Sequence, residues 1–137
     1  MKNIKQYYKE LGKIVYAVAA VDGTINPEEV KALHEFVQKD LSNHELNIDS
    51  SGMNEAFYVD FEFENSAKKN IDINTGIKSY VKFIHANYET GDELLLQRSV
   101  KLLETVTNVY TRQQEKEVVL QIKEEINEIS KNILKIN

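Results

Sequence analysis

The sequence predicts an all-α, single-domain bundle made of two pseudo-repeated helix-turn-helix units. Apolar residues recur at helical spacing along most of the chain, capping residues separate these segments, and residues 11–41 align with residues 96–126. One proline and five glycines are typical of an ordinary globular protein. A chain of 137 residues is long enough to bury one core, so we expect one domain over residues 1–137.

The first helix is expected from about Lys2 to Val21. Its end is marked by Asp22-Gly23, because glycine readily takes the left-handed conformation that closes helices. The apolar stripe of this helix, spaced by three and four residues, consists of Ile4, Tyr7, Leu11, Ile14, Val15 and Val18.

A second helix is expected to begin directly after Asn26. Asn26 can cap it, and Glu29 can complete a capping box. Pro27 suits the first helical position, because the N–H that proline lacks would be unpaired there anyway. The buried stripe of this helix is expected to be Val30, Leu33, Val37 and Leu41.

Residues 42–76 are expected to form an irregular or inserted segment, rich in Asn, Ser and Asp. Within it, the stretch FYVDFEFE, residues 57–64, alternates as a strand would, whereas Met53, Phe57 and Phe61 fit one side of a helix. A lone strand would leave its backbone groups unpaired unless a second copy of the protein supplied a partner. We therefore favour a helix, with the strand as the alternative.

Three further helices are expected in the second half of the chain. One covers about residues 77–88 and ends near Gly91, and the next starts at the capping-box pattern TGDE and covers about residues 93–110. The last and longest covers about residues 112–136.

The last helix carries a stripe whose members are separated alternately by three and four residues, as in a coiled coil. At about 1.5 Å per residue, a helix of roughly 25 residues reaches about 37 Å, which exceeds the width of a domain of this size, so we expect its end to overhang. Two interpretations stay open: the stripe belongs to the core, or the row from Ile122 to Ile136 contacts a protein partner or a second copy. The stripe consists of Val119, Ile122, Ile126, Ile129, Ile133 and Ile136.

Charge and hydropathy exclude two classes of partner. Seventeen basic and 22 acidic residues give a net charge of -5, which repels nucleic acid and offers no basic stripe for phosphates. The apolar run from Ile14 to Val21 is too short to cross a bilayer, which takes about 20 residues. We expect a cytoplasmic protein that does not insert into membranes.

No pattern in the sequence predicts catalysis. Cysteine is absent, and the three histidines, His34, His44 and His85, are too scattered to form a recognisable zinc site. A nucleophile elbow, a phosphate loop and a glycine-rich nucleotide fingerprint are also missing. We expect a protein that is not an enzyme.

The stretch VDGTINPEEV, residues 21–30, is similar to the second half of an EF-hand calcium loop. With Gly23 at position 6 of such a loop, acidic residues fall at positions 5 and 12. Positions 1 and 3 fall on Val18 and Ala20, which have no side-chain oxygen, so a complete EF-hand is excluded. The candidate metal ligands that remain are Asp22, Glu28 and Glu29.

Two interpretations of these acids stay open. Carboxylates at the start of a helix oppose the helix dipole, so they are favourable there without any metal. Alternatively, they form a weak site for calcium, magnesium or manganese, with water completing the coordination. In the aligned second unit the same positions hold the neutral residues Thr107, Gln113 and Gln114.

A family pattern appears in the run AVAAVDG, residues 17–23, followed by Ile25, by the pair Glu28-Glu29 and by Leu33. The pattern resembles the TerB-like family, which is named for a tellurite-resistance protein. The close match covers about residues 11–41, and helix order alone supports the rest.

The resemblance implies an all-helical bacterial domain in which the acids of the aspartate-glycine turn bind a divalent cation, in settings of metal or membrane stress. Asp22 and Glu29 match the family's first-turn acids, whereas its second-half acids match nothing here and residues 42–76 depart from the pattern. We expect a non-enzymatic binding or scaffolding module with a weak cation site at this turn. The alternatives are a metal-free protein-interaction domain and a small metal-dependent enzyme.

Overall fold

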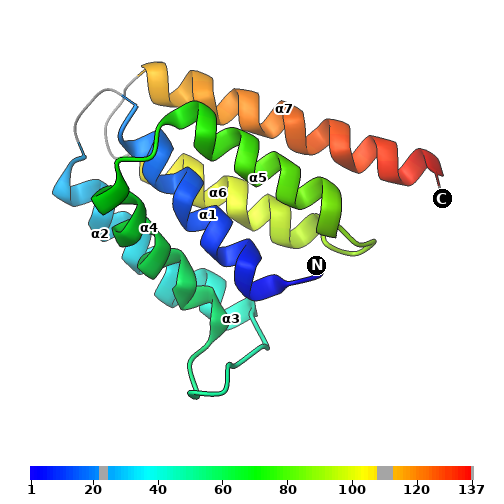
Figure 1. Cartoon of the computed structure of the whole chain (residues 1–137), viewed down its shortest axis with the longest axis horizontal. Coiled ribbons are helices and arrows are strands. Elements are labelled where there is room, and N and C mark those ends of the chain that lie inside the picture. Colours follow the sequence, from blue (N-terminus) through cyan, green and yellow to red (C-terminus); the bar gives the residue numbers. More distant parts are fainter. Residues whose placement is uncertain (22–24, 108–112, 137) are drawn as a thin grey trace.

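Helices form most of the chain (Figure 1). The structure, a computed structural model, describes residues 1–21, 25–107 and 113–136, with side chains described only for residues 117–129 of the last helix. No strand occurs within these ranges, where two residues, Ile48 and Asn54, form an isolated β-bridge. The helices are α1 (Ile4–Ala19), α2 (Pro27–Phe36), a π-helix (Val37–Leu41), α3 (Ser42–His44), a 3-10 helix (Glu55–Phe57), α4 (Tyr58–Lys69), α5 (Ile73–Asn87), α6 (Glu93–Thr107) and α7 (Gln113–Ile136).

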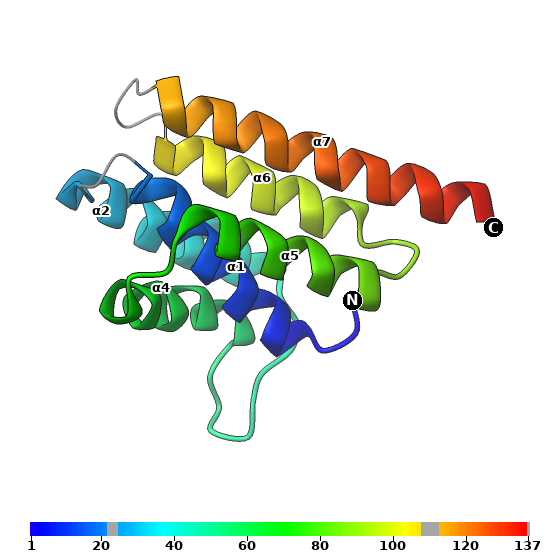
Figure 2. The same cartoon turned by 45° about the horizontal axis from the view of Figure 1, so that its top comes forward.

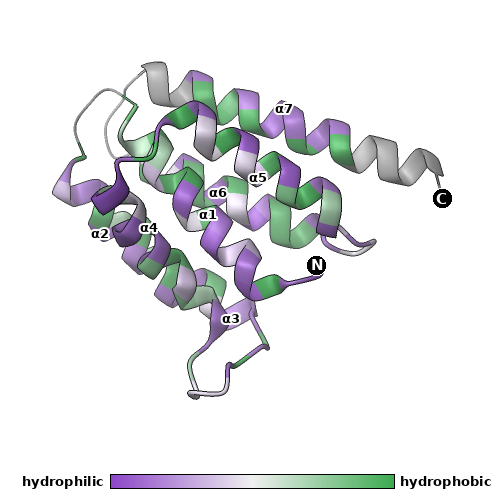
Figure 3. Cartoon of the chain, viewed as in Figure 1, coloured by the Kyte–Doolittle hydropathy of each residue, from purple (hydrophilic) through white to green (hydrophobic). Residues whose placement is uncertain are grey.

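Helix α1 lies in the middle of the bundle and packs against α4, α5, α6 and α7. Figure 2 shows α6 and α7 on one side of α1 and α4 on the opposite side. Apolar and polar residues alternate around each helix (Figure 3), which is the pattern of helices with one buried side. The buried apolar residues form a single cluster to which all the long helices contribute.

Two glycines allow the close packing of α1 against its neighbours. A methyl group on Gly12 of α1 would collide with the carbonyl oxygen of Val59 in α4. A methyl group on Gly76 of α5 would lie 2.9 Å from the Cβ of Ala17 in α1. Both contacts are possible only because these positions lack a side chain.

The expected start of the second helix is confirmed. The Asn26 side chain accepts a hydrogen bond from the Glu28 N–H at 3.0 Å, and the Asn26 N–H donates to the Glu29 carboxylate at 3.3 Å. Pro27 is the first helical residue, as the capping pattern predicts.

The helical interpretation of the aromatic stretch 57–64 is also confirmed, because Phe57 ends the 3-10 helix and residues 58–64 begin α4. Val59 and Phe63 point into the core and Phe61 is exposed. The segment expected to be irregular is therefore only partly so: its non-helical part is the loop between α3 and the 3-10 helix, which projects from the bundle (Figure 1), and the short link between α4 and α5.

The packing partners of the two expected hairpins differ. Helix α6 packs along α7, whereas α2 packs against α6 and α1 packs mainly against α4 and α5. The pseudo-repeat stays a prediction. Among the described residues, no helix is both long enough and apolar enough to cross a membrane.

Candidate functional site

The first sequence-predicted site is the turn that precedes α2. Asp22 lies outside the described residues. Glu28 is exposed, and Glu29 is buried, with 1% of its surface accessible and its carboxylate engaged in the capping box. Among the described side chains, those of residues 1–21, 25–107 and 117–129, no group of three or more histidines and carboxylates is arranged to hold a metal ion.

The capping box uses one oxygen of Glu29, Oε1, without any metal, and the cation hypothesis stays a prediction that depends on Asp22. Calorimetric titration of the chelator-treated protein with calcium and manganese tests it. The hypothesis requires binding heat and a higher melting temperature at millimolar metal, and both must disappear in Asp22→Asn. Neither effect is expected if the acids only begin the helix.

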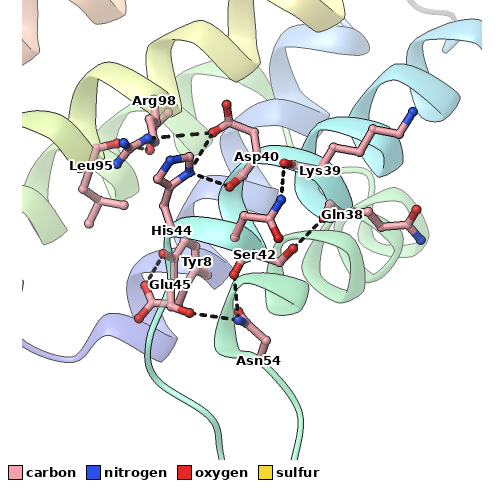
Figure 4. Close-up of polar contacts among 12 residues, drawn as sticks. Tyr8, Gln38, Lys39, Asp40, Ser42, His44, Glu45, Asn54, Leu95 and Arg98 are labelled. Atoms are coloured by element: carbon pink, nitrogen blue, oxygen red, sulfur yellow. Dashed lines mark hydrogen bonds and ion pairs between the residues drawn. The ribbon is translucent and has the colours of Figure 1, made fainter.

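A second cluster of charged side chains lies where the π-helix meets α6. Figure 4 shows Arg98 of α6 and His44 facing Asp40, at 3.9 Å from Nε and 3.8 Å from Nδ1 to the same carboxylate oxygen. His44 Nδ1 also lies 2.8 Å from the Asp40 carbonyl oxygen, and because a carbonyl only accepts, the proton is on Nδ1. A cleft of about 220 Å³, whose lining includes His44 and Arg98, lies beside this cluster, and π-helical turns often occur at functional sites.

The side chains of Tyr8, Glu45 and Asn54, beside this cleft, already form hydrogen bonds within the chain. The Tyr8 hydroxyl donates to Glu45, and burial, followed by that hydrogen bond, raises the pKa of Tyr8. The Asn54 side chain donates to the carbonyl oxygens of Ser42 and Glu45, both at 3.0 Å (Figure 4). These contacts fasten α1, α3 and the projecting loop together, which is a structural task.

The third sequence-predicted site is the apolar stripe of α7. Its described members, Val119, Ile122, Ile126 and Ile129, are all buried within the chain, between 0% and 6% exposed. For these residues the core interpretation is correct and the partner-contact interpretation is wrong, because their surface is already covered by α1, α5 and α6. The side chains of Ile133 and Ile136 lie outside the described residues, although the last turns of α7 extend past α5 and α6 (Figures 1 and 2).

An open groove runs along one flank of α7, and we call it the α5–α7 groove. It has a volume of about 620 Å³. Its apolar floor is formed by Ile77 and Val81 of α5, and the aliphatic parts of the lysines extend this floor. The groove is lined by Asn74, Ile77, Lys78, Val81, Lys82, His85, Gln121 and Glu125.

A hollow of about 310 Å³ extends the α5–α7 groove toward the start of α7. It is lined by Val21, Glu117, Val118 and Gln121. Because Gln121 lines both spaces, they adjoin along α7.

A second groove, the α6–α7 groove, runs along the other flank of α7. Its volume is about 390 Å³, and the exposed part of its apolar lining is the half-buried Val100, since Leu96 and Ile126 are buried. An ion pair between Lys123 of α7 and Glu104 of α6, at 3.1 Å, crosses it. Helix α7 thus buries one narrow stripe and leaves open grooves on both sides.

Sequence reasoning missed both grooves, because a groove depends on the distance between two helices that are remote in sequence. Ile77 and Val81 belong to the apolar stripe of the helix that the sequence predicts over about residues 77–88. The available signal was the pair Lys78 and Lys82, which places two like charges one helical turn apart beside that stripe.

Comparisons with protein-family models, with curated proteins and with solved structures found no match for this chain.

Proposed function

We propose that this chain is a protein-binding module whose binding surface is the pair of grooves beside α7. The supporting observation is that α7 covers the core with a single buried stripe and leaves a half-buried valine on each flank, Val81 in one groove and Val100 in the other. Open grooves that follow a helix suit the side chains of a second helix, which docks through residues spaced by three and four. This is the protein-interaction alternative that the sequence left open, without a requirement for metal.

The grooves favour a macromolecular partner over a small substrate. Catalysis needs a placed acid or base beside a cleft that excludes water. The ionisable groups lining the α5–α7 groove, Lys78, Lys82, His85 and Glu125, are all exposed, and those of the α6–α7 groove, Glu93, Glu104 and Lys123, are partly exposed. Binding and scaffolding therefore fit this surface better than an enzymatic role.

Site-specific photo-cross-linking in cells tests the proposal. A photoreactive amino acid is placed at Val81 in one groove, at Val100 in the other, and at the exposed Phe61 of α4 as the control. We expect a cross-link to one defined protein from a groove position and none from Phe61. The purified partner must then bind the full chain with a fixed stoichiometry, and Val81→Asp or Val100→Asp must weaken that binding. Equal labelling at all three positions, or labelling at Phe61 alone, would contradict the proposal.

A further inference from the structure

The two grooves beside α7 differ in charge, and this difference indicates what kind of partner one of them accepts. One wall of the α5–α7 groove carries Lys78 and Lys82, which are four residues apart and therefore project from the same side of α5. His85 continues this row toward the end of the helix. The row is basic, although the whole chain carries a net charge of -5.

The two lysines are available for a partner. Both are exposed, and among the described side chains neither has a carboxylate within ion-pair distance. By contrast, Lys123 in the α6–α7 groove is already paired with Glu104 across that groove. The α5–α7 groove thus combines an apolar floor with lysines that form no close ion pair among the described side chains, although the charge of Lys78 also acts on the Asp72 carboxylate. In the α6–α7 groove, by contrast, Lys123 is already paired.

The dimensions of the groove fit a helical segment. From Asn74 to His85 the α5 wall spans eleven residue steps, which is about three turns and about 16 Å. The adjoining hollow beside Val118 lengthens the space along α7. A docked helix of that length places about three apolar side chains, spaced by three and four, on the floor.

We propose that the α5–α7 groove binds an amphipathic helix of another protein whose apolar face is flanked by acidic residues. The acids face Lys78 and Lys82, and the apolar residues pack on Ile77 and Val81. Glu125 on the opposite wall disfavours acids on the far flank of the partner helix, so that flank is neutral or basic. This inference depends on the proposed binding function and adds the choice of groove and the chemistry of the partner.

Charge makes the binding selective. The chain as a whole carries a net charge of -5, so attraction at one short basic row favours docking of an acidic segment there over other places. The lysines supply this selectivity and the floor supplies most of the affinity, which separates their effects in a binding experiment.

The test uses the full chain and two labelled helical peptides of about sixteen residues. Both carry leucines at three- and four-residue spacing; one has glutamates on a single flank and the other has lysines at the same positions. Fluorescence anisotropy measures their dissociation constants. We expect the acidic peptide to bind at least about tenfold more tightly. Lys78→Glu with Lys82→Glu should reverse that preference, and Val81→Asp should weaken both peptides.

The matched control is Lys31→Glu with Lys101→Glu, which changes the net charge equally at exposed sites on α2 and α6. It should leave the preference for the acidic peptide unchanged. Circular dichroism confirms folding of each variant, and the lysine pair is informative even if Val81→Asp fails to fold, because both lysines are exposed.

Three results would overturn the inference. The first is equal binding, or no binding, of the two peptides. The second is binding that ignores the change at Lys78 and Lys82 but is lost in Val100→Asp; the partner would then use the α6–α7 groove and the proposed binding function would stand. The third is a dimer in sedimentation that Val81→Asp converts to a monomer, since a second copy would then fill the groove.

Discussion

The hydroxyl groups of Tyr7, Tyr80 and Ser99 form a buried chain of hydrogen bonds that joins three helices. Ser99 Oγ donates its only proton to the Leu95 carbonyl oxygen at 2.9 Å, so toward Tyr7 it can only accept. Tyr7 must then donate to Ser99 at 2.6 Å, and Tyr80 must donate to Tyr7 at 2.7 Å. The chain links α5 to α1 and α1 to α6.

Removing the central hydroxyl should destabilise the protein. Tyr7→Phe leaves Ser99 and Tyr80 without their shared partner in the core, so we expect the free energy of unfolding to fall by about 1–3 kcal/mol. Urea unfolding of the variant measures this. Tyr58→Phe is the matched control, because it also breaks a tyrosine hydrogen bond, to Asp49 at 2.6 Å, but at a partly solvated site where the loss is smaller. Equal losses in the two variants would contradict the burial argument.

The burial of these tyrosine hydroxyls should also raise the pH at which they ionise in an alkaline titration. Burial raises the pKa of Tyr7 to about 12 and also raises the pKa values of Tyr80 and Tyr8. A raised pKa favours the neutral hydroxyl in the folded state, so this stability is present below about pH 10 and is lost as the pH rises through about 12.

Near-ultraviolet absorbance of the folded protein measures this titration. At about pH 11 we expect these three of the seven tyrosines to remain protonated and to ionise only when the chain unfolds. Ionisation of all seven in a single step before unfolding would show that the three hydroxyls are accessible.

At the scale of the helices, the closeness of α1 and α4 depends on Gly12. Gly12→Ala gains about 1 kcal/mol of helix propensity, but its methyl group meets the Val59 carbonyl oxygen and forces the helices apart. We expect a net loss of about 1–3 kcal/mol in thermal or urea unfolding. Gly76→Ala should lose less, because the nearest atom there is a methyl carbon at 2.9 Å. A stabilised Gly12→Ala protein would show that α1 and α4 are not in tight contact.

Helix α7 is held to the bundle by its buried stripe, and the contribution of that stripe to the free energy of unfolding can be measured without any partner. Ile122 is 0% exposed, so Ile122→Ala should cost about 2–5 kcal/mol. Leu120, two residues earlier, is 56% exposed, and Leu120→Ala should cost well under that. Denaturant unfolding of the pair compares them directly. Similar costs would mean that α7 does not dock on this side.

Much at this scale was predictable from local pattern. Asn26 and Pro27 predict the start of α2, because capping depends only on residues up to three positions away. The alternation of Phe57, Val59 and Phe61 was compatible with a strand, and the helical alternative was favoured only because no second strand was available. An apolar pattern that repeats within one element was therefore sufficient to predict most of the helices.

Long-range features were beyond such reasoning. The buried row of α7 and an exposed contact row have the same spacing, so only the packing of α7 distinguishes Ile122 in the core from Leu120 on the surface. The grooves are likewise set by the separation of helices.

The shape of the projecting loop is held by Asp49, which accepts hydrogen bonds from Ser51, Met53 and Tyr58. The pKa of Asp49 is lowered, mainly through the Ser51 hydrogen bond.

At the scale of the whole molecule, α7 packs on the core of an acidic bundle through one narrow stripe, and a groove lies on each side of the helix. The basic row on α5 is a local exception to the net charge of -5. Because this row borders the larger of the two grooves, apolar contact and charge attraction act on the same partner segment.

Chemical-shift mapping by nuclear magnetic resonance, with the acidic amphipathic peptide added to the labelled full chain, tests the central claim most directly. We predict shifts that saturate with peptide and are concentrated between Asn74 and His85 of α5 and between Glu117 and Glu125 of α7. Shifts concentrated instead on α4 or the projecting loop, with α5 and α7 unchanged, would contradict the assignment of the binding surface to the grooves beside α7.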